Sequence, residues 1–384
     1  MRDKHRAILA AAASVAVSAV VAAGIIASPA QAQDFTFIGR FHTISTIAST
    51  VPANGDQNPY GVAVVGQSQG RLVRGNVLVS NFNNGANQQG TGTTIVQITP
   101  SGHRTVFAQI SPRGLPGACP GGIGLTTALS ILDGGWVVVG SLPTTGGNPA
   151  TMKAGCLLVL NSLGRVVTTF SGHGINGPWD MTAVNFGRSA DLFVTNVLNG
   201  TVAAALRAGI DPSTTPGPVV AGGTVLRLLV TTPPSGLGTP QLVSTTVIGS
   251  QFGERTDPSA LVVGPTGVAL GANDILYVAD TVGNRIAGIL DASTRRTSAS
   301  SGFTVSLNHF LNGPLGMALS PYGTILTTNG GDGYIVETQP EGHFFARRQL
   351  VPNGAGALFG LAVAPLASGI YFVNDNANTL QLLH

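Results

Sequence analysis

The stretch PTGVALGANDILYVADTVGNRIAGIL, from Pro265 to Leu290, decides the fold of the chain. Gly267 opens a short apolar strand, and ILYVAD alternates two sets of side chains as a sheet strand does. TVGN then supplies the Asx and glycine chemistry of a turn, and the chain returns from Arg285 onward. The stretch therefore predicts three short antiparallel strands.

The same unit recurs along the chain. An apolar second strand that ends in a short oxygen-bearing side chain occurs six times, at Asn81, Ser141, Asn196, Asp280, Asn329 and Asp375. The intervals are 60, 55, 84, 49 and 46 residues, and four-stranded propeller blades recur at roughly 40–50 residues. The sequence predicts an all-β, six-bladed β-propeller of four-stranded antiparallel blades, in which the longest interval is one blade with insertions.

The pattern P-x-G-V-A … L-Y-V-A-D-T-x-x-N-R-I, from Pro265 to Ile286, resembles the NHL repeat of secreted bacterial six-bladed propellers. More distantly, the chain is similar to senescence-marker-type lactonases and to propeller lyases. This resemblance implies the propeller fold. It does not imply one activity, because such propellers include lactonases, lyases and binding modules.

The two ends of the chain have separate roles. Residues 1–32 combine basic residues, an apolar run and an A-x-A box, which is typical of a secretory signal; an uncleaved membrane anchor is the alternative. We expect residues 33–384 to form one secreted or periplasmic propeller. Phe35 to Ile47 is strand-like and the last unit is one strand short. The N-terminal strand is therefore predicted to close the last blade, which removes two exposed edges.

The composition excludes several classes of protein. Charged residues are 9% of the chain, hydrophobic residues are 43%, and 53 of 384 residues are glycine, which argues against disorder. Without residues 1–32 the net charge is about +1, and no basic patch for nucleic acid is visible. H-E-x-x-H and P-loop motifs are absent. We expect a monomer without a membrane span that binds a small molecule or a protein.

Strand alternation predicts which loops share a face. The second-strand ends and the blade-to-blade loops lie together on what we call the top face, and the third-to-fourth turns lie on the opposite face. His173 and His309 each precede an Asn-Gly-Pro that leads into a first strand. They are candidate acid–base residues of the top face, or they brace a turn. His103 and His343 fall in third-to-fourth turns and are interpreted as turn residues.

The second-strand ends form the other candidate group. Their side chains either cap local turns or face the axial channel, with Asn81, Asn196 and Asn329 contacting a ligand. Asp280 and Asp375 would suit Ca²⁺, which prefers oxygen ligands. Trp179 and Asp180 would add an aromatic wall and a further carboxylate nearby.

The polar segment Glu254-Arg255-Thr256-Asp257-Pro258 lies between the third and fourth units, on the predicted top face. Glu254 and Asp257 are candidate ligand contacts. Alternatively, the charged side chains of this segment pair with one another and an Asp caps the local turn. The second-to-third loops are long in the first three units and short in the last three, which favours a pocket walled on one side.

The chain has two cysteines. Cys119 precedes the first strand of the second unit, and Cys156 begins its third strand. In an exported protein such a pair predicts a disulfide.

Two functions follow from these residues. We favour a binding or interaction module that uses the top-face loops, because no acid–base pair has diagnostic spacing. The alternative is a metal-assisted, lactonase-like hydrolase or a lyase. In it, His173, His309 and Asp180 would be catalytic, and Asp280 and Asp375 would hold the metal.

Overall fold

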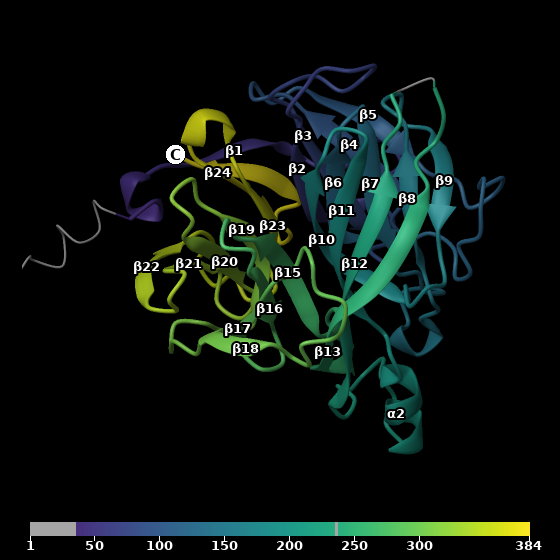
Figure 1. Cartoon of the computed structure of the whole chain (residues 1–384), viewed down its shortest axis with the longest axis vertical. Helices are drawn as coiled ribbons and strands as arrows, with labels where there is room; N and C mark the ends of the chain where they lie inside the picture. The colour runs from purple at the N-terminus through teal and green to yellow at the C-terminus, as the bar shows by residue number, and fades with distance from the viewer. Residues whose placement is uncertain (1–35, 235–236) are drawn as a thin grey trace, which may run out of the picture.

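The computed structural model describes residues 36–234 and 237–384. Six antiparallel sheets form a ring, and their first strands, β2, β6, β10, β15, β19 and β23, surround the centre (Figure 1). This arrangement confirms the predicted six-bladed β-propeller. The predicted signal, residues 1–32, lies outside the described residues.

The first three blades hold the N-terminal half. Blade 1 contains β2 Gln57–Val64, β3 Val77–Asn83, β4 Thr94–Ile98 and β5 Arg104–Gln109. Blade 2 contains β6 Leu125–Leu132, β7 Trp136–Ser141, β8 Cys156–Leu160 and β9 Val166–Phe170. Blade 3 contains β10 Gly177–Asn185, β11 Ser189–Val197, β12 Val220–Thr231, β13 Leu242–Asp257 and β14 Leu261–Val263.

The last three blades follow the same plan. Blade 4 contains β15 Pro265–Leu270, β16 Leu276–Asp280, β17 Arg285–Ile289 and β18 Phe303–Ser306. Blade 5 contains β19 Pro314–Leu319, β20 Ile325–Asn329, β21 Tyr334–Thr338 and β22 Phe344–Gln349. Blade 6 contains β23 Leu358–Val363, β24 Ile370–Asn374, β25 Thr379–Leu383 and the N-terminal β1 Ile44–Ser49.

The second strands are buried along their whole length, as β3, β16 and β20 illustrate. Each second strand lies between neighbouring strands and between neighbouring blades, so both of its faces are covered. This is why the sequence shows short, continuous apolar runs there. The outer strands, such as β5 and β22, carry both buried and exposed side chains because one face meets solvent.

The N-terminal strand closes the last blade, as predicted. β1 pairs antiparallel with β25, with Ile44 opposite Leu383. The strand is Ile44–Ser49 and not Phe35–Ile47, because the chain before it forms the 3-10 helix η1, Ile38–Arg40. His42 therefore precedes the closing strand.

Segment 36–41 packs on blade 5, where a buried carboxylate holds it. Glu337 accepts hydrogen bonds from the backbone N–H groups of Phe37 (3.1 Å) and Ile38 (2.9 Å). It also accepts one from the Thr324 hydroxyl, at 2.7 Å. The N-terminal segment is thus joined to blade 5 as well as to blade 6.

Buried hydroxyl groups link successive blades near the axis. In blade 3, Thr195 accepts a hydrogen bond from the backbone N–H of Asp180 (3.0 Å) and donates one to the carbonyl of Thr266 in blade 4 (2.7 Å). We call the hydroxyls that donate to the next blade in this way the interblade hydroxyls: Ser80, Thr126, Thr195, Thr266 and Thr328.

These five groups connect blades 1 to 6 in sequence. At the junction of blades 6 and 1, aromatic rings pack instead, with the centroids of Tyr60 and Phe359 3.8 Å apart.

Blade 3 departs from the predicted four strands. β13 is 16 residues long and continues past the sheet, and β14 pairs back on its last residues, so the blade has five strands. The short helix α2, Thr201–Arg207, lies between β11 and β12 (Figure 1). The 84-residue interval is therefore one decorated blade. Glu254 and Asp257 lie on a strand and not in a free link between blades.

Candidate functional site

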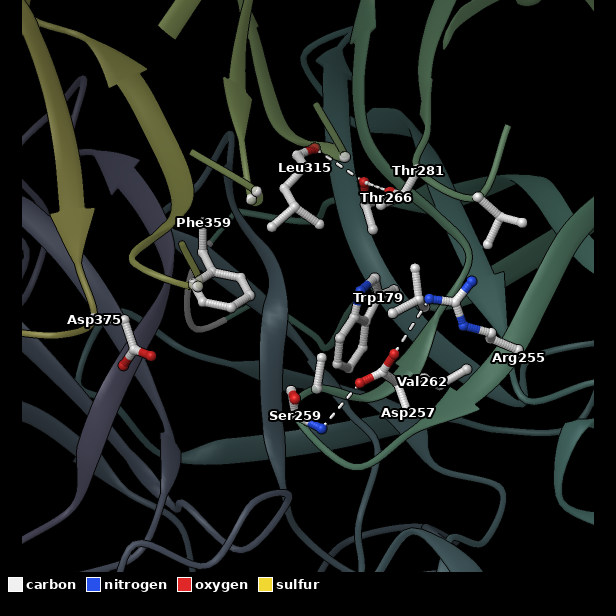
Figure 2. Close-up of a pocket in the computed structure, with 17 residues that line it drawn as sticks. Trp179, Arg255, Asp257, Ser259, Val262, Thr266, Thr281, Leu315, Phe359 and Asp375 are labelled. Atoms are coloured by element: carbon white, nitrogen blue, oxygen red, sulfur yellow. Dashed lines mark hydrogen bonds and ion pairs between the residues drawn. The ribbon is translucent and has the colours of Figure 1, made fainter. Parts of the chain in front are cut away.

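A cavity of about 430 Å³ opens on the top face (Figure 2). We call it the mouth cavity. It is lined by the beginnings of first strands, by residues that follow second strands, and by the turn between β13 and β14. The lining residues labelled in Figure 2 are Trp179, Arg255, Asp257, Ser259, Val262, Thr266, Thr281, Leu315, Phe359 and Asp375.

The mouth cavity is walled on one side. The β13–β14 hairpin reaches across to blade 1, where the Gln89 side-chain amide donates a hydrogen bond to the carbonyl of Pro258 (3.1 Å). Leu261 and Val262 of this hairpin belong to the apolar cluster around Trp179. On the side of blades 5 and 6 the lining combines Leu315, Phe359 and Asp375 with four glycines, at positions 313, 330, 331 and 356. The long second-to-third loops of the first three blades, which were expected to form the wall, do not line the cavity; the β13–β14 hairpin forms it instead.

Aromatic rings form the floor of the site. Tyr60 stacks between Phe82 and Phe359, with centroid distances of 4.4 and 3.8 Å. Trp179 meets Tyr60 edge-on at 6.0 Å. Trp179 and Phe359 line the mouth cavity itself, so a ligand there would contact two aromatic faces.

One repeat position supplies this floor. Tyr60, Thr266, Leu315 and Phe359 each precede the glycine of a first strand, and Trp179 holds the equivalent place in blade 3. Sequence reasoning singled out Trp179 alone. The other lining residues could have been found from the sequence by reading the position directly before the repeated glycine of each first strand.

Asp375 supplies a carboxylate to the mouth cavity. Burial raises its pKa to about 7. The Asn58 side-chain amide donates to this carboxylate and accepts a hydrogen bond from the Asn83 amide at 3.1 Å. Burial also raises the pKa of Tyr60, as does the nearby Asp375 charge, while a hydrogen bond with Asn58 opposes the shift. A group that ionises near pH 7 faces an aromatic, partly apolar cavity.

The Arg255–Asp257 pair lies on the side of the cavity away from Asp375 in Figure 2. The guanidinium Nη2 of Arg255 is 3.4 Å from the Asp257 carboxylate. Asp257 also accepts a hydrogen bond from the backbone N–H of Ser259 at 3.0 Å, which caps the hairpin turn. The Nε of Arg255 is buried and has no hydrogen-bond partner among residues 36–234 and 237–384. This nitrogen is enclosed by protein, so a ligand would meet the other guanidinium nitrogens of Arg255, which lines the cavity.

The predicted ring of second-strand ends does not face the cavity. Asn81 donates to the carbonyl of Thr50, Asn196 accepts from the N–H groups of residues 176 and 177, and Asn329 donates to the carbonyl of Phe310. Each side chain ties its strand end to the loop that enters its own blade. This is the capping role that the sequence left open, and it corrects the placement of these residues at a ligand.

Asp375 does not belong to this ring. In blade 4 the second-strand end Asp280 pairs with Pro265, near the start of the first strand. The residue at the corresponding position of blade 6 is Asn374, which pairs with Leu358. A shift of one residue along a strand turns the side chain to the opposite face. Asp375 therefore lines the cavity, as does Thr281, which follows Asp280.

Asp280 and Asp375 do not form the predicted calcium site. Asp280 is paired with Arg285 at 2.8 Å, accepts the backbone N–H of Gly283, and does not line the cavity. Asp375 is engaged by the amide of Asn58. In the described part of the chain, no group of three or more His, Cys, Asp or Glu side chains is placed to hold a metal ion.

The two candidate histidines lie away from the cavity. His173 is exposed in a turn between β9 and β10, and the exposed His309 packs on the Phe310 ring at 3.9 Å. The loop that joins an outer strand to the next inner strand crosses the full radius of the propeller. Its first residues therefore lie at the rim. Neither histidine can act on a ligand in the mouth cavity, which corrects the predicted acid–base pair.

Glu254 is also a structural residue. It is fully buried, and its carboxylate accepts the backbone N–H of Asn199 at 2.7 Å. Burial raises its pKa to about 7, while hydrogen bonds from Asn199 and Leu198 oppose the shift. It supports the loop after β11 and does not line the cavity.

The predicted disulfide is confirmed. Cys119 and Cys156 are bonded, with their Cα atoms 5.1 Å apart. The bond joins the segment before β6 to the start of β8, beside the long loop of blade 2.

Comparison with known proteins supports the fold. No protein-family model matches the chain, and no curated protein matches it either. Several solved structures are similar to the chain. A gluconolactonase of Xanthomonas campestris has a TM-score of 0.51 at 12% identity, with 88% of each chain covered.

Regucalcin, a calcium-binding protein of Agrobacterium tumefaciens, has a TM-score of 0.50 at 12% identity, covering 88% of this chain and 93% of that one. The PQQ-bound aldose sugar dehydrogenase of Streptomyces coelicolor has a TM-score of 0.50 at 14% identity, covering 88% and 97%. At these identities the likeness shows the fold alone. Among the described residues, no helix has the length and apolar character needed to cross a membrane.

Proposed function

We propose that this protein is an exported binding module that takes a small organic ligand into the mouth cavity. The observation that carries the proposal is the composition of that cavity. Two aromatic side chains, Trp179 and Phe359, lie between a carboxylate on one side and an Arg–Asp pair on the other. Small-molecule sites are concave and mostly apolar, with a few polar groups that fix the orientation of the ligand.

The geometry indicates the kind of ligand. A cavity of about 430 Å³ suits a single small molecule. Its apolar or ring face would pack on Trp179 and Phe359. A hydrogen-bond donor of the ligand would meet Asp375, and an acceptor would meet Arg255. The Cys119–Cys156 disulfide supports export, because disulfides persist in oxidising compartments.

Tryptophan fluorescence tests this proposal directly. The chain has two tryptophans: Trp179 lines the cavity, and Trp136 is buried in blade 2 with its indole N–H bonded to the carbonyl of Pro233. In a Trp136→Phe background, a bound ligand should change the emission of Trp179. A panel of monosaccharides, lactones and aromatic acids would be screened in this way. The variant Asp375→Asn should weaken binding of any hit that carries a donor by roughly 10-fold.

The same panel contains the result that would contradict the proposal. If hits bind equally well to wild type, Asp375→Asn and Arg255→Gln, the mouth cavity is not the binding site. Ser101→Ala lies in an exposed turn between β4 and β5 and serves as the matched surface control.

Lactone hydrolysis is the second candidate, and one observation favours it. Asp375 has a pKa of about 7, which suits a general base that activates water near neutral pH. The likeness in fold to a gluconolactonase makes glucono-1,5-lactone the first substrate to test. Under this proposal, base-catalysed opening of the lactone would be lost in Asp375→Asn and would rise with pH through about 7. A pH-stat assay against the uncatalysed rate measures both effects.

A further inference from the structure

A second, separate cavity lies at the other end of the axis. It has a volume of about 380 Å³, and three consecutive residues from each of the six first strands line it. We call it the lower funnel, and its lining residues are 62–64, 129–131, 181–183, 268–270, 317–319 and 361–363. Most of these side chains are apolar, and valine, leucine, methionine and alanine predominate.

A smaller cavity of about 50 Å³ adjoins the lower funnel and contains a carboxylate. The two cavities share five lining residues, Val62, Leu129, Met181, Met317 and Leu361. Asp180 lines the smaller one. Within residues 36–234 and 237–384, no other ionisable side chain lines the funnel or the smaller cavity.

The carboxylate of Asp180 is incompletely satisfied. Its Oδ1 accepts the backbone N–H of Met181 at 2.7 Å, and Oδ2 has no hydrogen-bond partner among the residues that the structure describes. Burial raises the pKa of Asp180 to about 7, and the hydrogen bond from Met181 opposes the shift. A partly buried carboxylate with a free oxygen, facing a cavity, is a position that a cationic group would stabilise.

The passage upward from Asp180 is narrow. The space between Asp180 and the mouth cavity is about 10 Å³ and is bounded by Trp179, Thr266 and Phe359. A cavity of this size holds at most about one water molecule. An organic group could therefore approach Asp180 from the lower funnel and not from the mouth cavity.

We propose that the lower funnel is a second ligand site, specific for a small organic cation with an apolar body. The apolar body fills the funnel of strand ends, and a primary ammonium group pairs with the free oxygen of Asp180 in the adjoining cavity. This site is independent of the mouth cavity, because the two have no lining residue in common.

Three probes of equal chain length test the proposal by isothermal titration calorimetry, below their micelle-forming concentrations and at pH 8.5. They are n-octylammonium, n-octanol and n-octyl sulfate. We expect n-octylammonium to bind more tightly than n-octanol, and n-octyl sulfate not to bind. The charge-assisted hydrogen bond to Asp180 should account for roughly 10- to 100-fold in affinity.

Two isosteric variants locate the probe. Asp180→Asn keeps an oxygen for the Met181 N–H and should reduce n-octylammonium affinity to that of n-octanol. Asp375→Asn removes a carboxylate of similar pKa from the mouth cavity and should bind the probe as wild type does. If Asp180→Asn does not fold, Ala362→Arg places a positive charge in the funnel lining. This change should weaken n-octylammonium more than n-octanol.

Three results would overturn the proposal. The first is equal binding of all probes to wild type and Asp180→Asn, which would indicate apolar capture alone. The second is loss of binding in Asp375→Asn, which would place the cation in the mouth cavity. The third is no binding of any probe to a folded wild type.

Discussion

Replacing Thr195 with Val tests how the blades are held together. The two side chains have nearly the same shape, so the change removes a hydroxyl and little volume. Thr195 is fully buried, and its hydroxyl accepts the backbone N–H of Asp180 at 3.0 Å and donates to the carbonyl of Thr266 at 2.7 Å. Thr195→Val therefore leaves one N–H and one C=O buried without these partners.

The expected cost follows from those two groups. A buried polar group left without its partner costs about 1–3 kcal/mol. Thr195→Val should therefore lower the free energy of unfolding by about 2–4 kcal/mol, after partial relaxation. Thr328 has the same geometry in blade 5, with 2.9 Å to the N–H of Gly316 and 2.9 Å to the carbonyl of Phe359. Thr328→Val should cost a similar amount.

Urea unfolding followed by far-UV circular dichroism measures this, and the midpoints should fall without a change in the m-value. Thr168→Val is the matched control, because Thr168 lies on the outer strand β9 and is partly exposed. It should change the free energy of unfolding by less than about 0.5 kcal/mol. A cost for Thr195→Val as small as that of the control would show that the interblade hydroxyls do not stabilise the ring.

Three further predictions concern the whole domain. Replacing Cys119 and Cys156 together with Ser should cost about 4 kcal/mol in the chain-entropy model, since the bond spans 37 residues; an unchanged urea midpoint under non-reducing conditions would refute this. Glu337→Ala should release segment 36–41, which limited proteolysis would detect as faster cleavage before Ile44 at unchanged rates elsewhere. The raised pKa of Asp180 means that the folded state binds more protons than the unfolded state between about pH 4 and 7. The contribution of Asp180 to the free energy of unfolding is fully present below about pH 4. It decreases as the pH rises to 7, by at most about 1.4 kcal/mol per pH unit. Asp180→Asn should flatten this slope, and an identical slope in both proteins would contradict the buried, protonated carboxyl.

The repeat pattern was sufficient to predict the blades and the closing strand, and the single pair of cysteines was sufficient to predict the disulfide. Each second strand is buried on both faces, so its apolar run is distinctive in the sequence. The extension of β13 through residues 254–257, and with it the fifth strand β14 that pairs on this extension, was not predicted, because residues 254–257 are polar and resemble a loop. Their burial depends on the hairpin folding over the top of the ring, which is a tertiary contact.

The site was harder to predict than the fold, and Asp375 shows why. The sequence NDNAN offers two adjacent residues that could end the strand, and the motif alone does not distinguish them. The register places Asn374 in the capping position and Asp375 in the cavity. His173 and His309 were assigned to the correct side of the molecule but lie at the wrong radius, since strand alternation gives height along the axis and not distance from it.

The sixth sheet is assembled from both extremities of the polypeptide. The side chains of Ser45 and His384 meet at 2.9 Å across 339 residues of sequence. Contacts of such range form late, because loop closure must precede them. A nascent chain would therefore stay an open arc until residues 379–383 of β25 can pair with β1, and removal of either strand would expose an edge of the same sheet. In a circular permutant whose new ends lie between two blades, β1 and β25 would be joined by continuous chain. We expect such a permutant to keep blade 6 intact when residues are removed from its new ends.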